Sequence, residues 1–227
     1  MPFPGLAERV AEVKGRIAAA VARGGHGQRV TVVAVTKTHG ADAAKAAYEA
    51  GLHDVGENKV QEALKKMSSV EVPVRWHLIG HLQRNKVKAL ERFVLLHSLD
   101  SARLADAVSA YGLARGRAVD ALLELNLSEE ETKGGFSAME LLPEAERLVA
   151  MAGIRVRGVM TMASFTATES ELHRTFAEAR DSLQVLAGAG HPATELSMGM
   201  SNDYEIAVEE GATIVRIGTT LFGARAK

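Results

Sequence analysis

Cysteine is absent from this 227-residue chain. Its absence excludes disulfides, thiolate nucleophiles and cysteine-bound zinc or iron–sulfur sites. Neither sign of charge is in excess, because 27 Lys and Arg residues stand against 28 Asp and Glu residues. The resulting net charge of -1 gives no electrostatic footprint of a nucleic-acid-binding protein, and no Lys/Arg cluster indicates binding to a membrane surface.

Long apolar runs are also missing. No stretch approaches the ~18 consecutive apolar residues that a membrane-spanning helix needs. The first 25 residues mix charged and apolar side chains at helical spacing, unlike the unbroken apolar core of a signal peptide. We therefore expect a cytoplasmic protein. Without a linker or a break in composition, residues 1–227 are expected to form a single α/β barrel domain, which this length can fill.

The chain does contain a regular alternation of helix and strand patterns. Apolar residues at three- and four-residue steps predict an amphipathic helix over residues 6–23. The β-branched run VTVVAVTK follows at residues 30–37 and is typical of a strand buried on both faces of a parallel sheet. Further strands are predicted at residues 53–56, 74–80, 93–99, 118–127, 154–160, 194–197 and 213–217. Further helices are predicted at residues 41–50, 60–67, 85–92, 102–115, 138–151, 169–187 and 203–210.

This order amounts to about eight strand–helix units with short connections. Repeated strand-then-helix order implies parallel strands joined by right-handed crossovers. Eight units favour a closed (β/α)8 TIM-type barrel with an extra N-terminal helix over the alternative, an open doubly wound sheet. In such a barrel the functional residues lie where strands end and the following loops begin, so polar residues at strand ends are the candidates.

A lysine closes the first predicted strand, at Lys37. It is either a surface residue with a buried stem or a lysine that points into the barrel mouth. In a dry, apolar environment the ammonium form is disfavoured, the pKa falls, and the amine becomes able to attack an aldehyde. Lys37 is the only lysine at the carboxyl end of a predicted strand, which favours the functional interpretation.

The last two units end in segments suited to binding an anion. Gly218 and Thr219 would open a short helix, where backbone N–H groups and a hydroxyl form an anion site. Ser201 follows the preceding strand and offers a further donor. Barrels frequently bind phosphate with the loops after strands seven and eight. Ordinary turn glycines and helix-capping residues are the alternative interpretation of each segment taken alone.

Two more strand-end residues are candidates. Arg216 lies within the last predicted strand and shares a pleat face with Gly218, so it is directed into the barrel. A buried arginine is costly unless it is paired, so we expect a ligand or a carboxylate partner. Asn58 follows the second strand, where it either contacts a ligand or caps the next helix in a capping box with Gln61.

Two histidines four residues apart, His77 and His81, resemble the helical zinc pattern. However, His77 lies in a strand-like run, His81 lies beyond a glycine, and no acidic ligand stands between them. A loop at the barrel mouth is the better interpretation of His81, and no metal site is predicted.

Five segments together resemble one family. The strings VTKT, GENKVQEA, WHLIGHLQRNK, ELSMGMSNDYEIA and VRIGTTLFG are similar to the signature segments of the pyridoxal phosphate homeostasis protein family. The resemblance implies a barrel similar to the N-terminal domain of alanine racemase, a fold type III-like arrangement. It also implies pyridoxal 5′-phosphate (PLP) as cofactor, held as a Schiff base on Lys37. Ser201, Gly218 and Thr219 then resemble the phosphate contacts, Arg216 the residue facing the pyridine nitrogen, and Asn58 the asparagine beside the ring.

Two functions compete on this basis. The first is a non-catalytic PLP carrier that acts in vitamin B6 homeostasis, is expected to be a monomer, and passes PLP to PLP-dependent apoenzymes. The second is a slow PLP-dependent amino-acid racemase that uses Lys37 and His81. A racemase needs a second base on the ring face opposite the lysine. In the alanine racemase relatives this base is a tyrosine from another domain, whereas the three tyrosines here all fall in predicted helices and the sequence ends just after the last unit. We therefore expect a protein that is not an enzyme.

Overall fold

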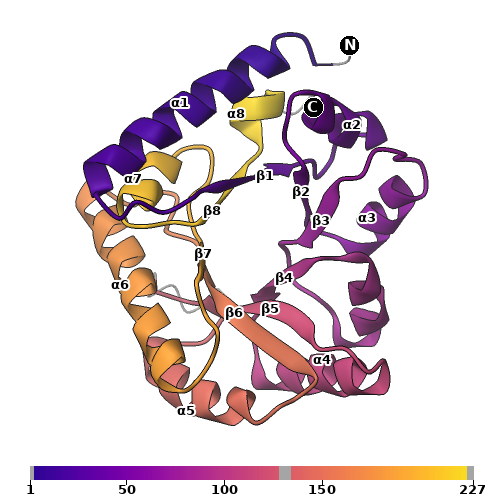
Figure 1. The fold of residues 1–227 in the computed structure, drawn as a ribbon, viewed down its shortest axis with the longest axis vertical. Helices are drawn as coiled ribbons and strands as arrows, with labels where there is room; N and C mark the ends of the chain where they lie inside the picture. Colours follow the sequence, from indigo (N-terminus) through magenta and orange to yellow (C-terminus); the bar gives the residue numbers. More distant parts are fainter. Residues whose placement is uncertain (1–2, 128–133, 224–227) are drawn as a thin grey trace.

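Eight parallel strands close into a barrel in sequence order in the computed structural model, which describes residues 3–127 and 134–223. Figure 1 looks through this ring of strands, with the helices arranged around its outside. The last strand pairs with the first, Thr31 lying opposite Ile214. The strands are β1 (Thr31–Val35), β2 (Asp54–Glu57), β3 (Arg75–Leu78), β4 (Leu95–Leu99), β5 (Val119–Leu125), β6 (Ile154–Thr161), β7 (Glu195–Ser197) and β8 (Ile214–Ile217). The predicted (β/α)8 barrel is confirmed.

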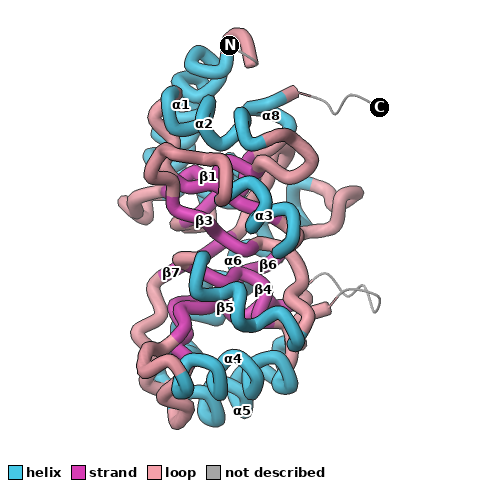
Figure 2. The backbone as a smooth tube through the Cα atoms, turned by 90° about the vertical axis from the view of Figure 1, so that its right-hand side faces the viewer, coloured by secondary structure: helices cyan, strands magenta, loops and turns pink. Residues whose placement is uncertain are grey.

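The extra N-terminal helix is confirmed as well. It packs against α7 and α8, beside the pairing of β1 with β8 (Figure 1). Figure 2 shows α4 and α5 at the opposite end of the molecule from α1. The helices are α1 (Leu6–Gly24), α2 (Ala41–Glu49), α3 (Val60–Met67), η1 (Arg84–Arg92), α4 (Ala102–Ala114), α5 (Ala138–Val149), α6 (Glu169–Gly188), α7 (Tyr204–Glu209) and α8 (Thr219–Phe222). Within the described residues, no helix combines the length and apolar character needed to cross a lipid bilayer.

Element boundaries differ from the sequence predictions by a few residues at most, with one change of type. The segment predicted as a helix at residues 85–92 is a 3-10 helix, η1. Leu90 is its only buried residue, so little packing is available to hold a regular α-helix there. The first strand ends at Val35 rather than at Lys37, because the carbonyl of Thr36 already accepts the turn hydrogen bond from the N–H of His39.

The apolar core lies in two places. The larger part fills the layer between the strands and the surrounding helices. Inside the barrel there is a small apolar cluster, formed by Val33, Leu95, Leu122, Met160 and Ile214. Alternate residues of a strand point to opposite faces, so these residues share the lumen with other inward-facing positions. Many of those positions carry polar side chains, which is unusual for a barrel interior.

Candidate functional site

A cavity of about 950 Å³ opens where the strands end and the following loops begin. Its wall includes all six residues that the sequence singled out, namely Lys37, Asn58, Ser201, Arg216, Gly218 and Thr219. Five further lining residues, Met162, Ala163, Phe165, Leu172 and Met200, give it an apolar side. Polar groups that converge in one large cavity at this end of a barrel are the usual signature of a binding site.

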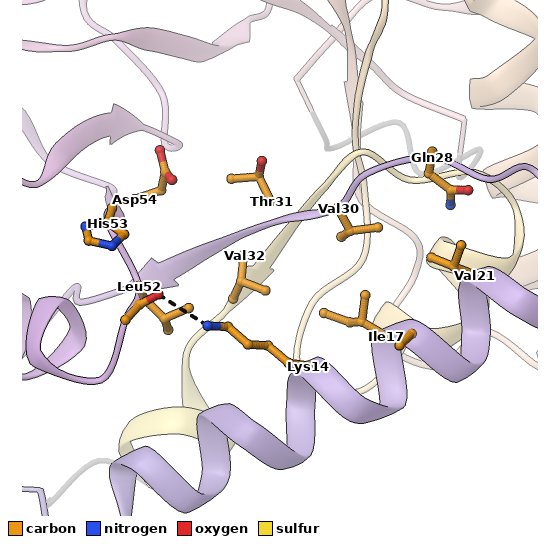
Figure 3. A pocket seen from close by; sticks show the side chains of 12 residues that line it. Lys14, Ile17, Val21, Gln28, Val30, Thr31, Val32, Leu52, His53 and Asp54 are labelled. Carbon is orange, nitrogen blue, oxygen red and sulfur yellow. Dashed lines mark hydrogen bonds between the residues drawn. The ribbon is translucent and has the colours of Figure 1, made fainter.

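A second cavity, of about 530 Å³, lies between α1 and the starts of β1 and β2. Figure 3 shows Lys14, Ile17 and Val21 of α1 facing Val30 and Val32 across it. Its lining is mainly apolar, and the amine of Lys14 donates to the backbone carbonyl of Gly51. Because it lies at the amino ends of the strands, away from the candidate residues, it is not the candidate site.

Lys37 lies two residues past the end of β1, half-buried, with its side chain on the cavity wall beside Val35. Residues two apart along an extended chain point the same way, so Val33, Val35 and Lys37 form an inward-facing series. The intervening Thr36 points outward and is fully buried. The structure thus favours the barrel-mouth interpretation of Lys37 over that of a surface lysine.

The backbone on both sides of Lys37 is clamped by charged side chains from β2 and α3. Lys66 is buried and donates to the carbonyl of Thr36 (2.7 Å), to Glu57 (2.6 Å) and to Glu62 (2.8 Å). Glu57 also accepts the hydroxyl of Thr36, and Glu62 accepts the N–H of Thr38 at 2.6 Å. Thr38 has φ 70, a left-handed conformation that β-branched residues rarely adopt. The clamp therefore holds a strained turn directly after Lys37.

Ser201, Gly218, Thr219 and Thr220 form a group that we call the anion corner. The hydroxyl oxygen of Ser201 accepts the N–H groups of Gly218 and Thr220, each at 3.3 Å. The predicted short helix is present as α8, which begins at Thr219 with Gly218 as its N-cap residue. The Ser201 hydroxyl, the Gly218 backbone and the Thr219 side chain thus meet at one edge of the cavity. Such a set of donors suits an anion with several oxygens.

Arg216 reaches the cavity from within the barrel and is 4% exposed. Its Nη1 donates to the carbonyl and the hydroxyl of Ser197, at 2.7 and 2.6 Å, and its Nη2 donates to the carbonyl of Thr161 at 3.0 Å. Within the protein, carbonyl and hydroxyl oxygens rather than a carboxylate accept these hydrogen bonds, and a ligand as a further partner of Arg216 stays a prediction. Burial lowers the pKa of Arg216 to about 10, opposed by the charges of Asp203 and Glu124.

Asn58 lies on the cavity wall rather than at a helix cap. Lys59 occupies the N-cap position of α3, and no side chain caps that helix, so the structure does not support the alternative of a capping box formed by Asn58 and Gln61. Gly80 explains how Asn58 is held: a Cβ atom at Gly80 would lie 2.6 Å from the carbonyl oxygen of Asn58. The loop after β3 therefore packs directly on Asn58 and leaves no room for a side chain at position 80.

Sequence reasoning missed an acidic side of the cavity. Asp100 and Glu124, after β4 and within β5, line it together with His81, whose Nδ1 lies 2.5 Å from Asp100. Burial and the nearby Asp100 raise the pKa of Glu124 to about 7, opposed by Arg216 and His81. The available signal was a charged residue, Glu124, next to the end of β5, in the strand sequence VDALLEL.

The two histidines of the zinc-like spacing, His77 and His81, lie in different parts of the barrel. His81 lies at the cavity mouth, whereas His77 is buried inside the barrel, where it contacts Asp54 and His97. Among the described residues, no cluster of three or more His, Asp or Glu side chains could hold a metal ion. The three tyrosines lie in α2, α4 and α7, and none of them lines the cavity.

Comparisons with known proteins agree with this geometry. Residues 12–226 match the family model of the alanine racemase N-terminal domain. A protein of Aquifex aeolicus named pyridoxal phosphate homeostasis protein is 40% identical, over 96% of this chain and 97% of its own length. A protein of the same name from Pseudomonas aeruginosa is 40% identical, over 97% and 96%. The solved structure of PipY from Synechococcus elongatus with PLP bound is similar, with a TM-score of 0.85, 36% identity, and coverage of 96% of this chain and all of PipY.

Proposed function

The chain belongs to the pyridoxal phosphate homeostasis protein family, and from this premise we propose that it holds PLP as a Schiff base on Lys37. We further propose that it acts in vitamin B6 homeostasis as a non-catalytic carrier that passes PLP to PLP-dependent apoenzymes. The observation that carries the proposal is the meeting of Lys37, Arg216 and the anion corner in one cavity.

The residues of the cavity fit the three reactive ends of PLP. The molecule has an aldehyde, a phosphate and a pyridine nitrogen. Lys37 supplies the amine for the aldehyde, the anion corner supplies hydroxyl and backbone donors for the phosphate, and Arg216 supplies a donor for the ring nitrogen. Asn58 and the apolar side of the cavity are available to the faces of the ring. Each end has a partner of complementary chemistry, which fixes the orientation of the ligand.

The position of Arg216 favours a protein that binds PLP over one that uses PLP for catalysis. Bound PLP offers an electron-accepting ring, and it does so best when its ring nitrogen is protonated. The guanidinium of Arg216 opposes that protonation, because two positive charges would meet in a buried site. The absence of any tyrosine from the cavity lining, among the described residues, further supports a role without proton transfer at a substrate carbon.

The proposal is tested by borohydride reduction of the PLP-loaded protein, followed by peptide mapping. We expect one phosphopyridoxyl group, on Lys37, and none in the Lys37→Ala variant. Lys59→Ala removes a neighbouring exposed lysine and is the matched control, which should keep the adduct. An adduct that persists on another lysine in Lys37→Ala would refute the assignment.

Deuterium exchange at the α-carbon of alanine and serine separates the carrier from the slow racemase. The wild-type protein at saturating PLP should barely exceed free PLP at the same concentration. Exchange or racemisation well above that control would establish the enzyme instead, with Lys37 and His81 as the candidate bases.

A further inference from the structure

A line of buried polar side chains crosses the barrel interior beneath Arg216. Nη1 of Arg216 lies 2.6 Å from the hydroxyl of Ser197, and that hydroxyl lies 2.8 Å from Nδ1 of His97. Nε2 of His97 lies 2.9 Å from Nδ1 of His77, whose Nε2 lies 2.9 Å from Asp54. The five residues come from β8, β7, β4, β3 and β2, so side chains of five strands form one continuous hydrogen-bonded series.

The series runs from one end of the barrel to the other. Asp54 opens β2 at the amino ends of the strands and borders the second cavity (Figure 3). Arg216 borders the large cavity at the opposite end. Asp54 is 6% exposed and Ser197 and His97 are fully buried, so these hydrogen bonds are shielded from bulk solvent. A buried polar group without a partner costs free energy, so each member depends on its neighbours.

The two ends fix the direction of every hydrogen bond between them. Arg216 can only donate, so the Ser197 oxygen accepts from it and the Ser197 hydroxyl proton is free to point to Nδ1 of His97. Asp54 can only accept while it is ionised, and hydrogen bonds with His77 and Arg75 outweigh burial and lower its pKa to about 2. Nε2 of His77 therefore donates to Asp54. From the other end, Nδ1 of His97 accepts the Ser197 hydroxyl, so Nε2 of His97 is left to donate to Nδ1 of His77.

The imidazole at the centre of the series is held neutral. Burial lowers the pKa of His97 well below its usual value. In this arrangement every donor in the series points toward Asp54, and each hydrogen bond has one donor and one acceptor. A proton on Nδ1 of His97 would instead leave the Ser197 hydroxyl proton without its acceptor.

We propose that Ser197, His97, His77 and Asp54 form a one-directional relay that positions Arg216 for the pyridine nitrogen of the cofactor. The inference rests on the proposed function, since it assigns a partner to the guanidinium. Three of the five N–H groups of Arg216 are taken by Ser197 and Thr161, which leaves two for a ligand in the cavity. Because the guanidinium is planar, fixing one edge of it also fixes the direction of the remaining donors.

The direction of the relay is tested first in the PLP-free protein. Long-range proton–nitrogen NMR at pH 7 distinguishes the two neutral forms of histidine from the charged form. We expect His77 and His97 both to be neutral, with the proton on Nε2. A proton on Nδ1 of His97, or a charged His97, would overturn the relay whether or not the protein binds PLP.

Positioning of Arg216 is tested by comparing PLP with 1-deaza-PLP, an analogue that has a carbon in place of the ring nitrogen. A hydrogen bond from a charged donor corresponds to a preference of about ten- to a hundredfold for PLP in the wild type. Ser197→Ala interrupts the relay next to Arg216, and Asp54→Asn removes the charge at its far end. Both variants should lower the ratio of affinities for PLP and 1-deaza-PLP toward one, and Ser197→Ala should lower it more strongly.

Ser98→Ala is the matched control, because Ser98 is a buried serine of β4 whose hydroxyl donates to the carbonyl of Gly80 outside the relay. It should keep the wild-type preference. If Ser197→Ala keeps that preference, or weakens both ligands equally, the relay has a structural role only and the proposal falls. If the wild type binds neither ligand, the proposed function fails together with the assignment of Arg216, while the NMR result still decides the direction of the hydrogen bonds.

Discussion

Thr219 belongs to the anion corner and lines the cavity beside Gly218, where its hydroxyl can donate to a bound phosphate. Loss of one charge-assisted hydrogen bond costs roughly 1.5–3 kcal/mol. Thr219→Val should therefore weaken PLP binding about ten- to a hundredfold. Pyridoxal, which lacks the phosphate, should bind poorly to the wild type and to the variant alike, as measured by titration of the absorbance of the ligand. Equal affinity of the wild type for PLP and pyridoxal would contradict the phosphate assignment.

Glu124 should make the PLP-free protein less stable as the pH rises. Its pKa is about 7 in the folded protein and 4.5 in the reference state, so the folded state binds more protons between these values. The stabilisation is present below pH 4.5 and is lost as the pH rises through 7. At ~1.4 kcal/mol for each pH unit, the loss between pH 5 and pH 8 is about 2 kcal/mol.

Glu124→Gln removes this titration without a large change in shape. Urea unfolding should give the variant a gain over the wild type at pH 8 that is about 2 kcal/mol larger than any gain at pH 5. The same difference at both pH values would mean that Glu124 titrates normally.

Single residues also mark the limit of what the sequence predicts. Lys37, Ser201 and Gly218 were identifiable because strand ends and turn residues have local signatures, and the structure brings them into one cavity. The partners of Arg216 were not identifiable. Its bonds to Ser197 and to the carbonyl of Thr161 depend on the side-by-side placement of strands, which no local pattern encodes.

At the scale of elements, α3 is fastened to the turn after β1 by one buried lysine. Removing one partner of a buried ion pair leaves an uncompensated charge and costs about 3–5 kcal/mol. Lys66→Met should destabilise the protein by this amount, because Glu57 and Glu62 would lose their cation. Lys65→Met is the matched control on the same helix, and its exposed side chain predicts a change within about 0.5 kcal/mol. Equal unfolding free energies for the two variants would show that the clamp contributes nothing.

Elements in which apolar residues recur at regular spacing were predicted well, and elements that depend on packing against neighbours were predicted less well. Helix α3 begins and ends at the predicted residues, since its apolar positions recur regularly. Helix α1 differs from its prediction by one residue. In contrast, η1 looked helical but is a 3-10 helix, and β3 is shorter than the predicted run. Where few side chains are buried, the number of residues in a regular element depends on neighbours that the local sequence does not reveal.

At the scale of the whole molecule, helix α1 rests on the last units of the barrel through a close backbone contact. A Cβ atom at Gly24 would lie 2.2 Å from the carbonyl oxygen of Glu209 in α7, so Gly24→Ala must push the two helices apart. We expect it to cost about 1–3 kcal/mol. Gly15→Ala is the matched change in the same helix, where a Cβ meets nothing within 4 Å. It should stabilise the protein by about 0.5–1 kcal/mol, because glycine weakens a helix interior.

Thermal or urea unfolding of the two alanine variants measures both effects. Opposite signs are expected. A stabilised Gly24→Ala variant would mean that α1 does not rest on α7 at this distance in solution.

The pairing of β1 with β8 has a consequence for how the protein is made. Strand β1 leaves the ribosome well before β8, its second neighbour in the ring, because about 180 residues separate the two strands in the sequence. Closure of a parallel sheet over such a separation is slow, and until then β1 presents an open edge to chaperones and to other nascent chains. Lys37 belongs to the first unit, and Ser201 and Gly218 belong to the last two. Under the proposed function, PLP binds only after the ring of strands has closed. The appearance of the yellow absorbance of bound PLP during refolding would therefore report the rate of barrel closure.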